Sequence, residues 1–306
     1  MRTTLPRKFL ISLLIFLIAC RPVQHRASSE TPLPGTSQSL EFGMGLRLER
    51  DDPSLEPSLH LATQTKVYWA AFDFDWAAVQ PTPNTWNDTF LEKLQQAHAQ
   101  HLAVMLSITN PPAWALTPEG PDIEQTAQLV LRLSRLNPPP AAIELFPAAN
   151  TYTGWGAIPS ASSYTRLFQT VQARLSAEHA KVYLVASGLQ NRLVSPHDIR
   201  DIEFLEQLYA AGLRPALLSL RLEGLTGEPI SPPSSNTLRH YEEIRAVMKT
   251  NQHTDGLLWI TGFSLADDVQ AESWLRQAYR MMKTHLYIGA VFYPQQYLAA
   301  AFSSSR

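Results

Sequence analysis

Acidic side chains follow several of the apolar segments that predict β-strands. Two carboxylates held close together at such strand ends can perform general acid–base or nucleophilic chemistry. The candidate residues are Asp73, Asp75, Glu223, Asp267 and Asp268. Each also fits a plainer interpretation, because an aspartate after a strand commonly caps a helix or a turn.

Glu144 differs from these residues because it lies inside the apolar segment 141–147. A carboxylate buried in a strand needs a charged or hydrogen-bonding partner. Arg47 and Arg221 also lie within apolar segments and could supply that partner. We therefore expect a structural ion pair that joins Glu144 to Arg47 or Arg221.

Other kinds of site find little support. The nine histidines are scattered, the single cysteine is Cys20, and no His-x-x-x-His, Cys-x-x-Cys or Gly-x-Ser-x-Gly motif occurs. The sequence thus predicts no metal site and no cofactor. The net charge of −2, without a basic patch, argues against a nucleic-acid partner.

Apolar segments alternate with helical periods along residues 40–306, and several segments are apolar nearly throughout, which is typical of parallel strands buried on both faces. The expected strands are 40–47, 66–73, 102–108, 141–147, 181–187, 216–222, 256–263 and 286–293. This order predicts a (β/α)₈ (TIM) barrel whose last helix is short or missing. An open doubly wound sheet is the alternative, although no Gly-rich phosphate loop follows any strand.

The connecting segments are unequal in length. The turns from helix to strand are short, as at 101–102 and 179–181, whereas the strand-to-helix segments 147–162 and 223–236 are long. Because barrels carry their active sites on strand-to-helix loops, we expect any functional site at that end.

Two stretches resemble clan A glycoside hydrolases, near the β-xylosidase and cellulase families. Residues 66–86 read KVYWAAFDFDWAAVQPTPNTW, and residues 109–115 read TNPPAWA. These resemble the second-strand and third-strand segments of the clan, and the likeness extends with gaps over about 42–293. The resemblance implies the same barrel and an ancestry in glycoside hydrolysis.

The resemblance fails at the positions that carry the chemistry. The clan's acid/base glutamate lies in the motif Glu-Ile-Trp-Asn-Glu-Pro-Asn. The corresponding residues 144–150 of this chain read ELFPAAN, so Ala148 stands at the position of that glutamate. The clan's nucleophile lies in the motif Trp-x-Thr-Glu-Phe-Gly. The corresponding residues 259–264 of this chain read WITGFS, so Gly262 stands at the position of the nucleophilic glutamate. Retaining enzymes need two carboxyl groups ~5–5.5 Å apart. The resemblance therefore implies that both catalytic glutamates are lost.

Three tryptophans and one asparagine are candidates for binding a sugar, because the apolar face of a sugar ring packs well on an indole. The resemblance places Trp155 and Asn150 just after the acid/base position. The candidate substrate-binding residues are Trp76, Trp114, Asn150 and Trp155. Trp76 and Trp114 fit equally well as plugs of the barrel end.

The N-terminus has the features of an export signal. Arg2, Arg7 and Lys8 precede a short apolar run, and residues 17–20 read LIAC, which resembles the bacterial lipobox. We expect residues 1–19 to be a signal peptide and Cys20 to carry lipid, such as palmitate. Residues 20–39, rich in Pro, Ser, Thr and Gln, would then form a flexible tether. This implies an extracytoplasmic protein anchored in the bacterial cell envelope, with the membrane as its partner.

The sequence leaves three functional interpretations open. The leading one is a membrane-anchored, catalytically degenerate glycoside-hydrolase-like protein, a pseudoenzyme that binds an oligo- or polysaccharide or interacts at the envelope. The second is a working glycosidase whose carboxylates have moved to positions such as Asp73 or Asp267. The third is a structural lipoprotein with a plugged barrel.

Overall fold

The structure is a computed structural model that describes residues 43–48, 58–60, 62, 67–266 and 271–297. The chain divides into two units, residues 1–30 and 31–306, and all described residues belong to the second. The predicted signal peptide, Cys20 and the tether lie outside the described residues and stay predictions. None of the described helices is long and apolar enough to cross a bilayer.

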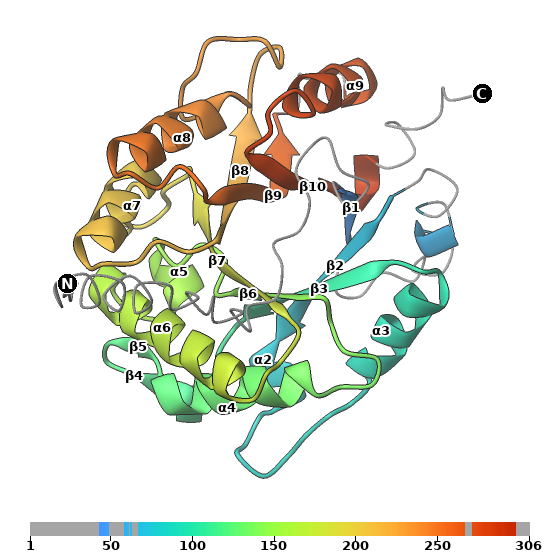
Figure 1. Cartoon of the computed structure of the whole chain (residues 1–306), viewed down its shortest axis with the longest axis vertical. Coiled ribbons are helices and arrows are strands. Elements are labelled where there is room, and N and C mark those ends of the chain that lie inside the picture. Colours follow the sequence, from blue (N-terminus) through green and yellow to red (C-terminus); the bar gives the residue numbers. More distant parts are fainter. Residues whose placement is uncertain (1–42, 49–57, 61, 63–66, 267–270, 298–306) are drawn as a thin grey trace, which may run out of the picture. The chain divides into compact units, whose positions relative to one another are not determined.

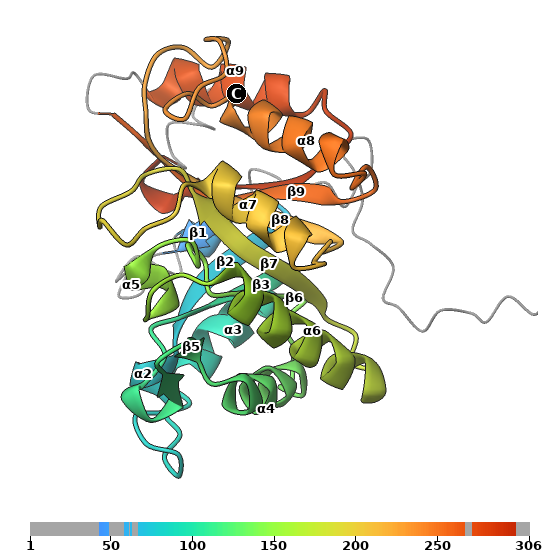
Figure 2. The same cartoon turned by 90° about the vertical axis from the view of Figure 1, so that its left-hand side faces the viewer.

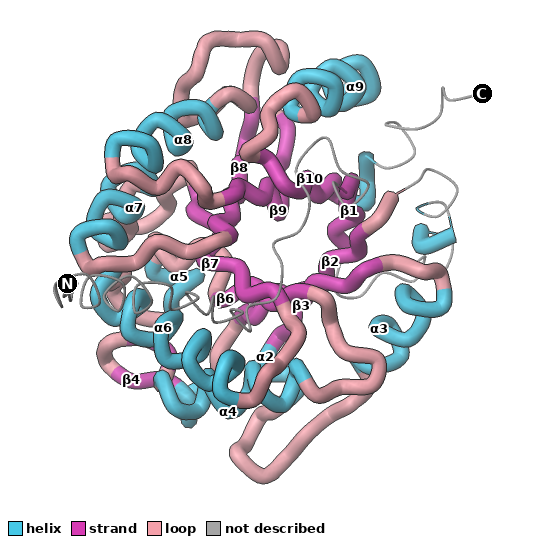
Figure 3. Tube along the Cα trace, in the orientation of Figure 1, coloured by secondary structure: helices cyan, strands magenta, loops and turns pink. Residues whose placement is uncertain are grey.

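Eight parallel strands close into a barrel in the order β1-β10-β9-β8-β7-β6-β3-β2. The strands form a ring enclosed by helices (Figure 3). Their bounds are β1 Gly43–Leu48, β2 Trp69–Asp75, β3 Ala103–Thr109, β6 Ala142–Leu145, β7 Tyr183–Gln190, β8 Leu217–Leu225, β9 Leu257–Leu265 and β10 Ile288–Pro294. The prediction of a (β/α)₈ barrel is confirmed, and the alternative of an open sheet is wrong.

Helices connect most of the strands to the next strand along the chain (Figure 1). Their bounds are α2 Trp76–Val79, α3 Phe90–Ala99, α4 Ile123–Ser134, α5 Tyr152–Trp155, α6 Ala161–Ala177, α7 Asp201–Ala210, α8 His240–Thr250 and α9 Ala271–Met282. Neighbouring helices α6, α7 and α8 lie side by side outside the strands (Figure 2). After β10 the described chain adds only a 3₁₀ turn, η2 Gln295–Tyr297.

The segment after β3 holds elements that the sequence pattern did not predict. A 3₁₀ turn, η1 (Ala113–Ala115), leads into a small hairpin made of β4 (Leu116–Thr117) and β5 (Gly120–Pro121). The hairpin belongs to the strand-to-helix end of the barrel. It covers Trp155, whose indole N–H donates to the carbonyl of Glu119 at 2.9 Å.

The barrel interior changes character along its axis. Near the strand starts it is apolar, filled by a cluster that includes Trp69, Met105, Trp259 and Phe292. The ring of Trp69 lies edge-on to that of Trp259, with centroids 5.0 Å apart. Closer to the strand ends the inward side chains are polar and charged. This gradient places the chemistry-bearing residues at the end of the barrel with the long loops.

Candidate functional site

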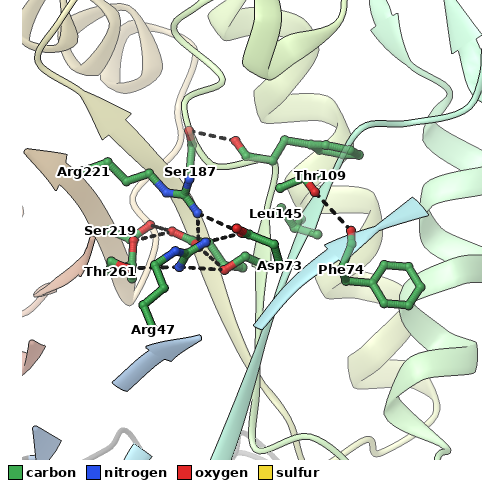
Figure 4. A network of polar contacts seen from close by, with 12 residues as sticks. Arg47, Asp73, Phe74, Thr109, Leu145, Ser187, Ser219, Arg221 and Thr261 are labelled. Carbon is green, nitrogen blue, oxygen red and sulfur yellow. Dashed lines mark hydrogen bonds and ion pairs between the residues drawn. The ribbon is translucent and has the colours of Figure 1, made fainter. Parts of the chain in front are cut away.

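Two arginines and one aspartate meet at the carboxyl end of the barrel. Arg47 on β1 and Arg221 on β8 both hydrogen-bond Asp73 Oδ1 on β2, Arg221 at 3.3 Å (Figure 4). Arg47 Nη1 also donates to the carbonyl of Thr261 on β9, at 3.0 Å. Because the three charged residues come from three strands, this cluster ties together the mouth of the barrel.

Asp73 is held as a carboxylate by these contacts. Its partial burial acts to raise the pKa, but the charges of Arg47 and Arg221 and their hydrogen bonds outweigh burial and lower the pKa below its ordinary value. A carboxyl group held ionised in this way is a poor proton donor. Asp73 therefore lacks the property that a general acid needs.

Glu144 on β6 lies deeper and is fully buried. Its Oε1 accepts hydrogen bonds from Ser219 at 2.6 Å and Thr261 at 2.7 Å, and its Oε2 accepts one from Ser107. Arg221 Nη2 lies 3.9 Å from Oε2, so Arg221 is the nearer of the two expected partners, while Arg47 pairs with Asp73 instead. Hydroxyl groups thus provide most of the hydrogen bonds to this buried carboxyl group.

The sequence pattern did not identify these hydroxyl residues. Ser107, Ser219 and Thr261 look like ordinary members of apolar strands. The available signal is strand alternation, which puts residues two apart on the same face, such as Ser219 with Arg221. Small polar residues at inward-facing positions could have been recognised as partners for a buried carboxylate.

Gly262 lies within β9, where its partner in the β8 ladder is Arg221. A Cβ at this position would meet Arg47 Cδ at 3.6 Å and Arg221 Cγ at 3.9 Å, which are ordinary contacts. The position therefore faces the charged cluster and has room for a Cβ.

Ala148 follows the end of β6, the fourth strand of the barrel along the chain. It is buried and has a left-handed backbone, with φ of 64°. Its N–H donates to the carbonyl of Gly188, and its carbonyl accepts from the Thr151 N–H. Ala148 thus follows the last residue of β6, Leu145, and Gly262 lies in the second half of β9, Leu257–Leu265.

A cavity of about 220 Å³ opens above the charged cluster. Asp73 and Glu223 both line it, together with Gly262. Glu223 is half-buried, and its Oε2 accepts a hydrogen bond from Ser264 at 3.4 Å. Polar groups of Gln295 and Gln296 complete one wall. The cavity offers carboxylate, amide and hydroxyl groups, which can bind a polar ligand.

Asp75 is not part of this cluster. Asp75 is the N-cap of α2, where its side chain accepts from the Ala78 N–H, and both of its oxygens accept from Asn110. Its capping role matches the plainer interpretation of an aspartate after a strand. Asp267 and Asp268 lie outside the described residues.

The candidate sugar-binding tryptophans are largely enclosed. Trp76 and Trp155 are fully buried, so neither offers a ring face to solvent. Trp114 is half-buried, packs edge-on against Trp76 with centroids 5.7 Å apart, and donates its indole N–H to the Gln80 carbonyl. These contacts occupy the edge of Trp76 and the indole N–H of Trp114. Only Trp114 keeps partial access to solvent.

Asn150 is likewise buried, and its side chain forms hydrogen bonds with backbone groups. Its amide N–H groups donate to the carbonyls of Gln190 and Ile199, and its oxygen accepts from the Gln190 N–H at 2.9 Å. These three bonds use both N–H groups and one lone pair of the oxygen. Asn150 therefore clamps the end of β6 to the loop after β7 and has little left to offer a ligand.

Among the described residues, no group of three or more His, Cys, Asp or Glu side chains is arranged to hold a metal ion. The chemistry available at the mouth is therefore that of two guanidinium groups, the carboxylates of Asp73 and Glu223, and neutral polar groups. Such a set can orient hydroxyl groups of a ligand.

No protein-family model and no curated protein matches this sequence. Solved structures match the fold. A family 39 glycoside hydrolase from Bacteroides cellulosilyticus WH2 has a TM-score of 0.64 at 12% identity, over 84% of this chain and 56% of its own. A GH5-4 broad-specificity endoglucanase from Clostridium acetobutylicum has a TM-score of 0.60 at 8% identity, over 85% of this chain and 89% of its own.

A third neighbour is a GH128 endo-β-1,3-glucanase from Sorangium cellulosum, with a TM-score of 0.53 at 14% identity, over 82% of this chain and 86% of its own. The chain spans little more than half the length of the family 39 enzyme. At these identities the likeness establishes the fold alone: a barrel of the kind used by glycoside hydrolases.

Proposed function

We propose that this glycoside-hydrolase-like barrel is catalytically degenerate and binds carbohydrate at the bacterial cell envelope, where lipid on Cys20 anchors it. The main support for the loss of catalysis is that Ala148 and Gly262 lie near the ends of the fourth and seventh barrel strands. Neither side chain can donate a proton or form a glycosyl ester. The polar cavity beside Gly262 is the place where we expect sugar hydroxyl groups to bind.

The state of Asp73 supports the loss of catalysis. Arg47 and Arg221 both engage Asp73 Oδ1, and they keep the pKa of Asp73 low. Glu144 is buried beneath this cluster and saturated by hydroxyl donors. Asp73 lines the cavity but is held ionised, which makes it a poor proton donor, and Glu144 does not line the cavity.

A working glycosidase is the second candidate, and one observation favours it. Asp73 and Glu223 line the same cavity from β2 and β8. An ionised Asp73 could attack a sugar while Glu223 donates the proton to the leaving oxygen. In that case the catalytic carboxylates have moved to other strands.

Hydrolysis and binding assays on the same preparation separate these functions. We expect no turnover of aryl β-glycosides by the wild-type protein and measurable retardation in affinity gels that contain soluble β-glucan or xylan. Robust hydrolysis that disappears in both Asp73→Asn and Glu223→Gln would overturn the proposal in favour of the enzyme. If neither hydrolysis nor binding occurs, the structural lipoprotein with a plugged barrel takes its place.

A further inference from the structure

Tyr152 is an exposed aromatic residue at the carboxyl end of the barrel, unlike the candidate tryptophans Trp76 and Trp155. Its side chain is 45% exposed, whereas Trp76 and Trp155 are buried. It begins α5 in the long segment after β6, four residues beyond Ala148. Tyr68 is similarly exposed, at 41%, but it precedes β2 and so lies at the opposite end of the barrel.

A second aromatic ring lies beside Tyr152. The centroid of the His197 ring is 5.9 Å from that of Tyr152, with 43° between the ring planes. His197 is exposed and belongs to the loop that follows β7. Two adjacent strand-to-helix loops therefore contribute neighbouring rings to the same surface, which we call the rim shelf (Tyr152 and His197).

Hydrogen bonds fix the backbone of both loops at this point. Asp198 Oδ1 accepts the Tyr152 N–H, and Asp198 Oδ2 accepts the N–H groups of Val194 and Ser195, all at 2.8 Å. These bonds act to lower the pKa of Asp198 against the opposing effect of its burial, so the carboxylate stays ionised. A surface ordered before binding loses less conformational entropy when a ligand arrives.

We propose that the rim shelf is a stacking site for one ring of a polysaccharide chain whose other rings occupy the cavity at Asp73 and Glu223. The inference rests on the proposed carbohydrate binding. Aromatic rings pack against the apolar C–H face of a sugar while its hydroxyl groups stay in water. Arg192 is exposed in the same loop as His197, and its guanidinium group carries donors of the kind that sugar hydroxyl groups accept.

The position of the shelf selects for a long ligand. The cavity is lined by residues of β1, β2, β8, β9 and β10 and of the segment after β10, whereas the shelf is formed after β6 and β7. A short sugar can occupy one of these places, and a longer chain can occupy both. Binding at two linked places strengthens affinity without any new contact. The ligand class is therefore an extended polysaccharide.

Oligosaccharides of two lengths test this inference by titration calorimetry on the full chain in detergent. The probes are cellobiose with cellohexaose and laminaribiose with laminarihexaose. We expect tighter binding of a hexasaccharide than of its disaccharide, and Tyr152→Ala to weaken only hexasaccharide binding, by about three- to tenfold. Tyr152→Phe, which keeps the ring, should bind as the wild type does. Tyr68→Ala is the matched control and should change neither affinity.

The outcomes separate the shelf from the proposed function. Hexasaccharide binding that is unchanged in Tyr152→Ala would refute the shelf and leave carbohydrate binding in place. Equal weakening of both lengths would refute the division between shelf and cavity. If the wild-type protein binds none of the four probes, both the shelf and carbohydrate binding of this class are overturned.

Discussion

Gly262 and Arg221 are direct partners in the ladder between β9 and β8, and the space above Gly262 is bounded by guanidinium side chains. A glutamate side chain at this position would extend toward Arg47 and Arg221. The charged cluster of this protein thus surrounds the position at which the sequence resemblance expects a catalytic carboxylate. This relationship makes the proposed loss of both catalytic carboxylates testable, by introducing a glutamate at each of the two positions.

The double variant Ala148→Glu with Gly262→Glu should gain measurable hydrolysis of aryl β-glycosides over the wild type. General acid–base assistance alone contributes ~10²–10⁴-fold, and the nucleophile opens a covalent route. Release of nitrophenol measures the gain, and each single variant is the control. Activity in Gly262→Glu alone that equals the double variant would show that position 148 is not the acid/base site.

Two glycines on neighbouring parts of the barrel should respond differently to alanine. A Cβ at Gly188 would lie 2.9 Å from Glu144 Oε1, whereas at Gly262 the nearest atom is 3.6 Å away. We expect Gly188→Ala to destabilise the protein by about 1–3 kcal/mol. Gly262→Ala should change stability by less than about 1 kcal/mol. Chemical denaturation measures both, and equal effects would contradict the packing described around Glu144.

Removal of the Asp73 charge should destabilise the barrel. Asp73→Asn leaves the guanidinium groups of Arg47 and Arg221 facing each other with less compensation. Breaking a buried pair costs about 3–5 kcal/mol, and because a third of the Asp73 side chain is exposed we expect about 2 kcal/mol. Asp75→Asn is the matched control, since asparagine also caps helices and should cost less than about 0.5 kcal/mol. A similar loss in both variants would argue against the ion-pair cluster.

Stability should fall at alkaline pH because of His240. The buried imidazole contacts Asp201 at 2.5 Å and Glu243 at 2.6 Å. Burial acts to lower the pKa of His240, but hydrogen bonds and charges of the two carboxylates raise it above 6.5. Because the folded pKa is the higher one, this stabilisation is fully present below about pH 6.5 and is lost as pH rises through the folded pKa.

Thermal melts across this range test the effect. The melting temperature of the wild type should decline above neutral pH, and His240→Gln should show a lower melting temperature at pH 6 with a flatter profile. His197→Gln, an exposed histidine, is the control and should follow the wild type. A His240→Gln profile that runs parallel to the wild type would assign the decline to other groups.

Replacement of Cys20 tests the expected anchor. Cys20→Ala should give an unprocessed or soluble product, because only the cysteine thiol can be acylated at that place. Fractionation of cells with detection of the barrel measures the outcome. Normal processing and unchanged membrane association of the variant would exclude lipidation at Cys20.

The fold could be predicted because its signals are local. Apolar segments that bury both faces identified all eight strands, although each begins a little later than predicted. The small β4–β5 hairpin was missed because its strands are too short to show a period. Glu144 was recognised as buried because an acid inside an apolar strand is conspicuous.

The site was harder to predict because it depends on register and on loop packing. Arg47 pairs with Asp73 because β1 and β2 are adjacent with a register that sets Arg47 opposite Ala71, and spacing along the chain does not reveal that register. Trp155 was expected to be open to ligands, yet the β4–β5 hairpin covers it. The sequence around a tryptophan does not show whether a loop from elsewhere in the chain will cover it.

The polar layer inside the barrel has a consequence for how the chain unfolds. Its members come from β1, β2, β3, β6, β8 and β9, so strands from both ends of the sequence must be in place before Glu144, Asp73 and the arginines are compensated. A half-formed barrel would bury these charges without partners, at a cost of several kcal/mol. We therefore expect β1 and β9 to unfold together, and neither half of the barrel to persist as an autonomous fragment.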